Sequence, residues 1–136
     1  MSDPSTQSVL VVDDDEGVAL TFSRMLRLHG YQVRTTTNPE TGLALAEAHT
    51  PDAVLLDLRM PIVGGLEFLR RLRHLKNSQT TSVAIVTGDY FIDEEIAAEI
   101  KQLGAEVCFK PLWLDDLVDV VRAMLTTDSS SATAVA

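Results

Sequence analysis

The chain has little cysteine, few basic residues and no long apolar run. Its single cysteine, Cys108, excludes an internal disulfide and a cysteine-based zinc cluster. It carries 11 Lys and Arg against 20 Asp and Glu, a net charge of -9, so it lacks the basic patch that direct nucleic-acid binding requires. No apolar run exceeds four residues, so neither a membrane span nor a signal peptide is predicted. These absences predict a cytoplasmic protein that binds neither nucleic acid nor membranes.

The length and composition predict one globular domain. Hydrophobic residues make up 46% of the 136 residues, which is enough for one core, while the length is short for two domains. We expect this domain to span residues 8–125, after a flexible N-terminus at residues 1–7. Residues 126–136 are small and polar without periodicity, so they are predicted to be a flexible tail or the start of a linker.

Short apolar runs alternate with helical patterns five times along the chain. This alternation is typical of α/β proteins, in which helices connect parallel strands. The predicted strands lie near residues 8–13, 32–36, 53–57, 82–87 and 106–109, and the predicted helices near 16–29, 39–48, 65–75, 93–103 and 114–125. The sequence therefore predicts a doubly wound, flavodoxin-like sheet of five parallel strands in the order 2-1-3-4-5.

Several residues refine the predicted helices. Asp15 and Glu16 are predicted to be the N-cap and the first turn of the first helix. Gly30 and Gly104 follow the first and fourth helices, where a left-handed glycine ends a helix without steric cost. The first helix has one predicted apolar stripe, formed by Val18, Phe22, Met25 and His29.

Three carboxylates end two of the predicted buried strands. Asp13 and Asp14 follow the apolar run of the first strand, and Asp57 follows that of the third. In this strand order the ligand crevice opens at the carboxyl ends of the first and third strands, which is where these residues lie. Ionised carboxylates beside an apolar core need a partner, and a hard divalent cation with oxygen ligands is the natural one. Two further strands end in Thr87 and Lys110, so the five residues together predict a pocket for magnesium and a phosphoryl group on Asp57.

The motifs at these strand ends resemble those of one known family. They are Val11-Val12-Asp13-Asp14, Leu56-Asp57 with Met60-Pro61 behind it, Val86-Thr87-Gly88 and Lys110-Pro111. In this order they resemble a response-regulator receiver domain, the CheY-like module of two-component signalling. The resemblance covers about residues 8–125. It implies a regulatory protein, not an enzyme, that takes a phosphoryl group from a sensor histidine kinase or a histidine phosphotransfer protein.

The resemblance also implies a role for each site residue. Asp57 is the phosphate acceptor, while Lys110 and Thr87 contact the phosphoryl oxygens. Phosphorylation changes the surface of the fourth helix, fifth strand and fifth helix, which controls an output domain or target protein or tightens a homodimer. The cofactor is Mg²⁺, with Mn²⁺ as the alternative ion, and its ligands are Asp13, Asp14, Asp57 and the backbone carbonyl of Arg59.

The chain departs from the family pattern at the predicted switch surface. Relatives carry Tyr or Phe three residues before the lysine, where this chain has Val107. Phe109 is on the same face of the strand and either replaces that aromatic side chain or packs in the core. A separate feature is a predicted ion pair between Arg59 and Asp89, which follow the site residues by two positions and would modulate hydrolysis of the phosphoryl group.

Three other protein classes share part of this pattern. A phosphatase of the haloacid-dehalogenase type needs a second Asp at the position of Arg59. A flavodoxin-like FMN carrier needs a first loop that binds phosphate, and acidic residues in that loop would repel it. An interaction scaffold of the same fold is the alternative from a different functional class, and the intact set of Asp57, Thr87 and Lys110 argues against it.

Overall fold

The computed structural model describes residues 7–88, 92–110 and 114–135, and its strands form one parallel sheet. The strand order is β2-β1-β3-β4-β5, so the predicted doubly wound α/β fold is confirmed. The strands are β1 (Ser8–Val12), β2 (Gln32–Thr36), β3 (Ala53–Leu56), β4 (Ser82–Thr87) and β5 (Ala105–Phe109). The helices are α1 (Glu16–Leu28), α2 (Pro39–His49), α3 (Gly65–His74), α4 (Glu94–Gln102) and α5 (Leu114–Val135).

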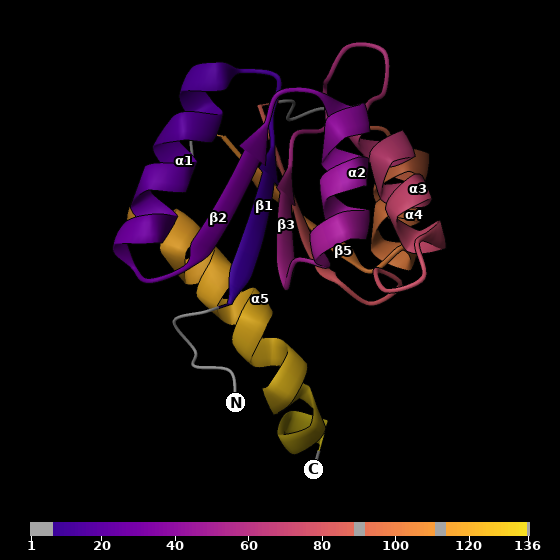
Figure 1. Ribbon diagram of the computed structural model, residues 1–136. Coiled ribbons are helices and arrows are strands. Elements are labelled where there is room, and N and C mark those ends of the chain that lie inside the picture. The colour runs from indigo at the N-terminus through magenta and orange to yellow at the C-terminus, as the bar shows by residue number, and fades with distance from the viewer. Residues whose placement is uncertain (1–6, 89–91, 111–113, 136) are drawn as a thin grey trace.

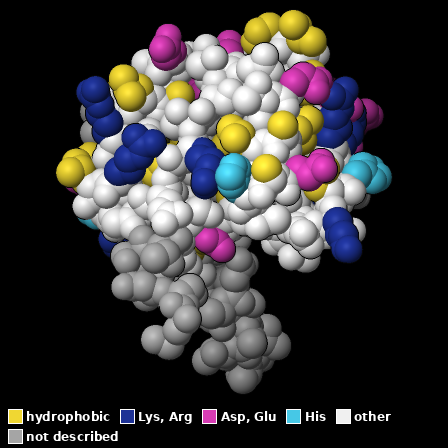
Figure 2. Space-filling model, in the orientation of Figure 1, with side chains coloured by type: hydrophobic (Ala, Val, Ile, Leu, Met, Phe, Trp, Pro, Cys, Tyr) yellow, Lys and Arg dark blue, Asp and Glu magenta, His cyan; other side chains and the backbone are white. Residues whose placement is uncertain are grey.

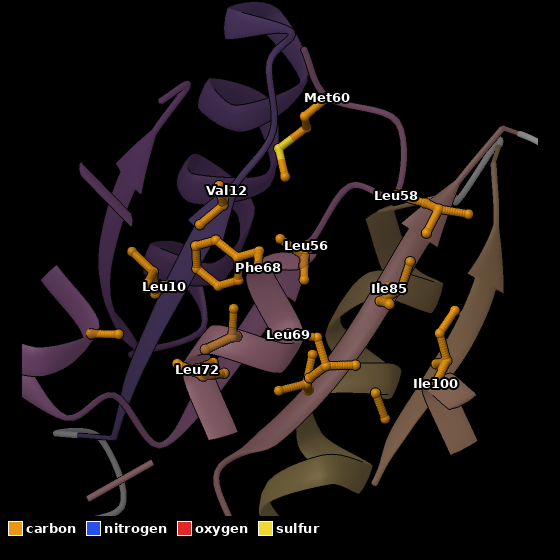
Figure 3. Close-up of a cluster of buried hydrophobic side chains, with 14 of the residues drawn as sticks. Leu10, Val12, Leu56, Leu58, Met60, Phe68, Leu69, Leu72, Ile85 and Ile100 are labelled. Carbon is orange, nitrogen blue, oxygen red and sulfur yellow. The ribbon is translucent and has the colours of Figure 1, made fainter. Parts of the chain in front are cut away.

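Helices cover both faces of the sheet (Figure 1), with α1 and α5 on one face and α2, α3 and α4 on the other. Because successive side chains of a strand point to opposite faces, β1 contributes to two separate cores. Val9 and Val11 pack on the side of α1 and α5. Val12 packs on the other side, where Phe68 of α3 lies beside it and beside Leu56 (Figure 3). Burial on both faces explains why the central strands are continuous apolar runs.

The strand register brings the ends of the four site-bearing strands to one edge of the sheet. Val12 pairs with Leu56 across β1 and β3, so the residues that follow them lie at the same level. Leu56 in turn pairs with Ile85, two residues before Thr87. Thr87 pairs with Phe109, the residue before Lys110. The acidic, hydroxyl and ammonium side chains therefore converge at the carboxyl edge of the sheet.

The predicted ends of most helices and strands agree with the structure, but the predicted end of the last helix is wrong. Gly30 and Gly104 have φ angles of 94° and 77°, as predicted for glycines that end helices. Helix α5 continues to Val135, beyond its predicted end near residue 125. Residues 126–135 contain neither Gly nor Pro, so nothing in that segment stops the helix. That residues 126–136 form a flexible tail or the start of a linker stays a prediction. Among the described residues, no helix is long and apolar enough to cross a membrane.

The core-facing side of α1 contains three residues of the predicted stripe: Phe22 is buried, and Val18 and Met25 are partly buried against the same core. Its buried residues are Ala19, Phe22, Ser23 and Leu26, whereas His29 is exposed at the C-cap. Small residues such as Ala19 and Ser23 let the helix approach the sheet closely, and they carry little weight in an apolar periodicity. Asp15 is the N-cap, as predicted, and its carboxylate accepts a hydrogen bond from the Val18 backbone N–H at 3.1 Å.

Candidate functional site

Three carboxylates converge at the carboxyl edge of the sheet. Asp13 and Asp57 are buried and Asp14 is exposed. One carboxylate oxygen from each residue lies within 4.8 Å of those of the other two. The strand ends predicted from the sequence thus form one cluster, which is open to solvent on the side of Asp14.

Backbone hydrogen bonds hold the two buried carboxylates in place. The Asp57 N–H donates to the Val12 carbonyl at 3.0 Å, which extends the ladder between β1 and β3 by one residue. The Asp13 N–H donates to the Thr36 carbonyl at 3.2 Å, which ties the same edge to β2. The Asp13 carboxylate in turn accepts a hydrogen bond from the Asp15 N–H at 2.9 Å. The strand ends and the start of α1 therefore position the cluster together.

Lys110 is the cation that the structure places in this cluster. Its Nζ lies 3.2 Å from Asp13 Oδ2 and 3.8 Å from Asp57 Oδ2. The shorter of these contacts, between Lys110 and Asp13, was not predicted from the sequence. A lysine bridging both carboxylates offsets part of their mutual repulsion.

Thr87 is fully buried at the end of β4. Its carbonyl accepts a hydrogen bond of 2.7 Å from the Lys110 N–H, so the ends of β4 and β5 are joined directly beside the cluster. The structure thereby brings Thr87, Lys110 and the three carboxylates to the same sheet edge. Their roles in phosphoryl transfer stay predictions.

The charge state of Asp57 reflects this crowding. Burial, followed by the negative charge of Asp13, raises the pKa of Asp57 from 3.8 to about 6. Lys110 opposes that rise, as does a hydrogen bond of 3.4 Å from the Arg59 N–H to Asp57 Oδ1. Burial of Asp57 and the neighbouring charge of Asp13 together outweigh the attraction of Lys110 and the hydrogen bond from Arg59.

The donor set fits a hard divalent cation. All three members offer carboxylate oxygens, which Mg²⁺ and Mn²⁺ prefer over nitrogen or sulfur ligands. Two of the three carboxylates, those of Asp13 and Asp57, are buried beside an apolar core, where an ionised acid needs a positive partner. A cation held by the cluster would be such a partner.

The remaining predicted residues lie around this cluster or outside the described residues. Arg59 is exposed in the loop after β3, while Asp89 lies outside the described residues, so their predicted ion pair is untested. Val107 of β5 is half-buried against the core cluster of α3 and α4. Phe109 is 43% exposed, so the alternative that it packs in the core is wrong. That Phe109 replaces the aromatic side chain absent at Val107 stays a prediction.

Comparison with known families identifies the family of this chain. The profile described as response regulator receiver domain matches residues 9–122, which is most of the chain. The chain belongs to the response regulator receiver domain family. Receiver domains act in two-component signalling, and accepting a phosphoryl group is general for the family. The acidic cluster lies in this receiver domain and has the ligand atoms to hold a metal ion.

Individual relatives agree with this assignment. The transcriptional regulatory protein PrrA of Mycobacterium tuberculosis is 35% identical over 126 residues, which are 92% of this receiver chain and 52% of that protein. Sporulation initiation phosphotransferase F of Bacillus subtilis is 28% identical over 125 residues, 91% of this chain and 98% of that protein. The chemotaxis protein CheY4 of Vibrio cholerae superposes with a TM-score of 0.81 at 27% identity, covering 88% of this chain and 99% of that one. The chain thus spans about half the length of PrrA and nearly all of the second relative.

Proposed function

We propose that Asp57 of this receiver domain is the acceptor in a phosphorelay. The observation that carries the proposal is the convergence of the Asp13, Asp14 and Asp57 carboxylates within 4.8 Å, with the Lys110 ammonium 3.8 Å from Asp57. A cluster of this kind is costly for folding alone, because removing ionised acids from water is unfavourable. Family membership gives the reaction class, and this geometry favours Asp57 as the residue that performs it.

The transfer needs no covalent chemistry beyond one displacement. An ionised Oδ of Asp57 attacks the phosphorus of a phosphohistidine, the new P–O bond forms, and the P–N bond breaks with its electron pair left on the imidazole. With acetyl phosphate as donor, acetate leaves instead. Lys110 neutralises charge on the phosphoryl oxygens, and its 3.2 Å contact with Asp13 holds its ammonium at the site before transfer. In-line positioning by the buried strand ends supplies the remainder of the rate enhancement.

The same cluster would hold the divalent cation. Asp13, Asp14, Asp57 and the backbone carbonyl of Arg59 are the proposed ligands, with Mg²⁺ as the ion and Mn²⁺ as the alternative. When bound, the ion would neutralise the acids and the equatorial phosphoryl oxygens. Support comes from the oxygen-only donor set and from the burial of two of its members, Asp13 and Asp57.

Phosphorylation would switch the surface formed by α4, β5 and α5. A phosphoryl group adds charge near -2 and strong acceptors, which recruit the Thr87 hydroxyl and displace the adjoining segments. On β5, Phe109 pairs with Thr87 and Val107 pairs with Ile85, so both residues lie on the strand that adjoins the proposed movement of Thr87. The proposed partners are a cytoplasmic sensor kinase or histidine phosphotransfer protein upstream. Downstream, the partner is an output domain, a target protein or a second copy of the chain.

Arg59 and Asp89 would modulate how long the signal lasts. Both follow site residues by two positions, so an ion pair between them would obstruct the water that hydrolyses phospho-Asp57. The exposure of Arg59 is consistent with a place at the rim of the site.

Intact mass spectrometry tests the proposed function. Incubation with acetyl phosphate and Mg²⁺ should add about 80 Da, one phosphoryl group, to the wild-type chain and nothing to Asp57→Asn. A scaffold of the same fold would gain no mass in either form.

A further inference from the structure

The loop between β3 and α3 contains a strained turn at Ile62. Ile62 has a φ of 70°, and the Val63 N–H donates to the Pro61 carbonyl at 2.8 Å. A hydrogen bond from residue i+2 to residue i around a positive φ defines the classic γ-turn, which is rare and strained. The Ile62 side chain is also 102% exposed, the highest value among the exposed large hydrophobic side chains of the described residues.

Both properties of Ile62 are unfavourable for the isolated chain. A β-branched residue is the least suited to positive φ, which glycine adopts without steric cost. Thr50, the other non-glycine residue with positive φ among those described, has a structural reason: it caps α2, and its N–H donates to the Ala46 carbonyl. Ile62 ends no helix and buries no side chain. Backbone strain that persists without a folding role is concentrated at functional positions.

Buried neighbours fix the turn in this conformation. Met60 and Val63 are 8% and 4% exposed and belong to the core cluster shown in Figure 3, so the loop is anchored on both sides of its tip. The Gly65 N–H also donates to the Leu58 carbonyl at 2.9 Å, which closes the base of the loop. Ile62 is therefore held outward on a rigid support, and ordering it on binding costs little entropy.

The tip of this loop lies at the edge of the sheet where Asp57 is located. In Figure 1 the loop between β3 and α3 rises above the carboxyl edge of the sheet. Figure 2, in the same orientation, shows exposed hydrophobic side chains at the same position. Asp57 is buried at the base of this loop, five residues before Ile62 in the sequence. A protein that brings a phosphohistidine within bonding distance of Asp57 must cover this edge.

We propose that Ile62 is an apolar anchor for the protein that donates the phosphoryl group, and that it fits a recess beside the donor's phosphohistidine. This inference rests on the proposed acceptor role of Asp57. A small donor such as acetyl phosphate reaches Asp57 without touching Ile62, so the anchor acts only with a protein donor. The exposed side chains near this edge differ in kind: Asp14 and Asp15 are acidic, Arg59 is basic, and Ile62 is the exposed large hydrophobic residue of the loop between β3 and α3.

The exposed leucines of α1 lack the positive φ that distinguishes Ile62. Leu28 is 80% exposed and Leu20 46%, but both are in α1 with helical backbone. Single exposed leucines are ordinary on protein surfaces and need no explanation. Leu28 lies in the last turn of α1, at the sheet edge opposite the site, and so provides a matched control.

The experiment compares a protein donor with a small donor. The protein probe is the histidine kinase that, among purified autophosphorylated kinases of the source genome, transfers phosphate to the wild-type chain fastest. The small probe is acetyl phosphate with Mg²⁺. Ile62→Gly should slow transfer from the kinase about tenfold, the scale of losing one interface anchor, and leave the acetyl phosphate rate unchanged. The same variant should unfold at higher urea concentration, because the strain is relieved.

Two further variants separate docking from structure. Ile62→Leu keeps an apolar side chain and should retain kinase transfer, whereas Leu28→Ala should match the wild type with both donors. Equal kinase transfer by Ile62→Gly and the wild type, with acetyl phosphate active on both, would overturn the anchor and leave the acceptor role of Asp57 intact. Failure of both donors on the wild type would instead remove the proposed function, and the anchor with it.

Discussion

Replacing Asp57 with asparagine is expected to stabilise the protein above about pH 6. Asn has nearly the same shape as Asp but carries no charge, so the substitution removes the repulsion from Asp13 without opening a cavity. Burial and Asp13 raise the pKa of Asp57 from 3.8 to about 6. At about 1.4 kcal/mol per pKa unit, this difference corresponds to an upper limit of about 3 kcal/mol. Water at the open mouth of the site screens the charge, so we expect a gain of about 1–2 kcal/mol in the free energy of unfolding.

The pH dependence of this gain follows from the direction of the pKa change. A raised pKa in the folded state means that the folded protein binds the proton more tightly than the unfolded chain does. Wild-type stability from this group is then fully present below about pH 4 and is lost as the pH rises through about 6. The advantage of Asp57→Asn should therefore appear between these values and stay constant above them.

Urea unfolding followed by circular dichroism measures the effect. Wild type and Asp57→Asn would be compared at about pH 7.5 and about pH 4.5, without divalent ions, and most of the difference should vanish at the lower pH. Glu47→Gln, an exposed acid on α2, is the matched control and should change stability by less than about 0.5 kcal/mol. Mg²⁺ should restore wild-type stability by binding the folded state. An Asp57→Asn variant that is less stable than the wild type at both pH values would refute the reasoning.

Three further predictions concern the ion, the lifetime of the phosphoryl group and the output surface. Asp14→Ala should weaken Mg²⁺ binding in isothermal titration calorimetry far more than His29→Ala, and equal effects would contradict the ligand set. Arg59→Ala and Asp89→Ala should each change the rate at which phospho-Asp57 loses phosphate, with a double variant that departs from additivity. Unchanged lifetimes in both single variants would contradict the proposed role of this ion pair. Phosphorylation should alter hydrogen exchange in α4 and β5, and a change confined to α1 would contradict the switch surface.

The fold was predictable because local patterns agree with the global arrangement. The runs that became β1 and β3 are apolar on both faces, and the structure buries both faces beneath helices. The acids that follow them were predicted to converge because parallel strands end at a common edge, and they do. The strand ends therefore carry most of the information about the site.

Details that depend on packing were not predictable from periodicity. The buried face of α1 includes Ala19 and Ser23, and residues this small are indistinguishable in sequence from exposed ones. The 3.2 Å contact of Lys110 with Asp13 depends on a lysine side chain reaching across the sheet edge, which strand order alone does not fix. The turn at Ile62 breaks the rule that positive φ belongs to Gly, Asn or Asp, so sequence rules for turns overlook it.

Mass measurement of the phosphorylated chain tests the central claim most directly. Wild type, Asp57→Asn and Asp13→Asn would be incubated with acetyl phosphate and Mg²⁺, and the labelled peptide located after proteolysis. The account predicts a gain of about 80 Da on the peptide that contains Asp57, no gain in Asp57→Asn, and slower labelling of Asp13→Asn. Phosphate incorporation by Asp57→Asn at the wild-type rate, or a label on any other peptide of the wild-type chain, would contradict it.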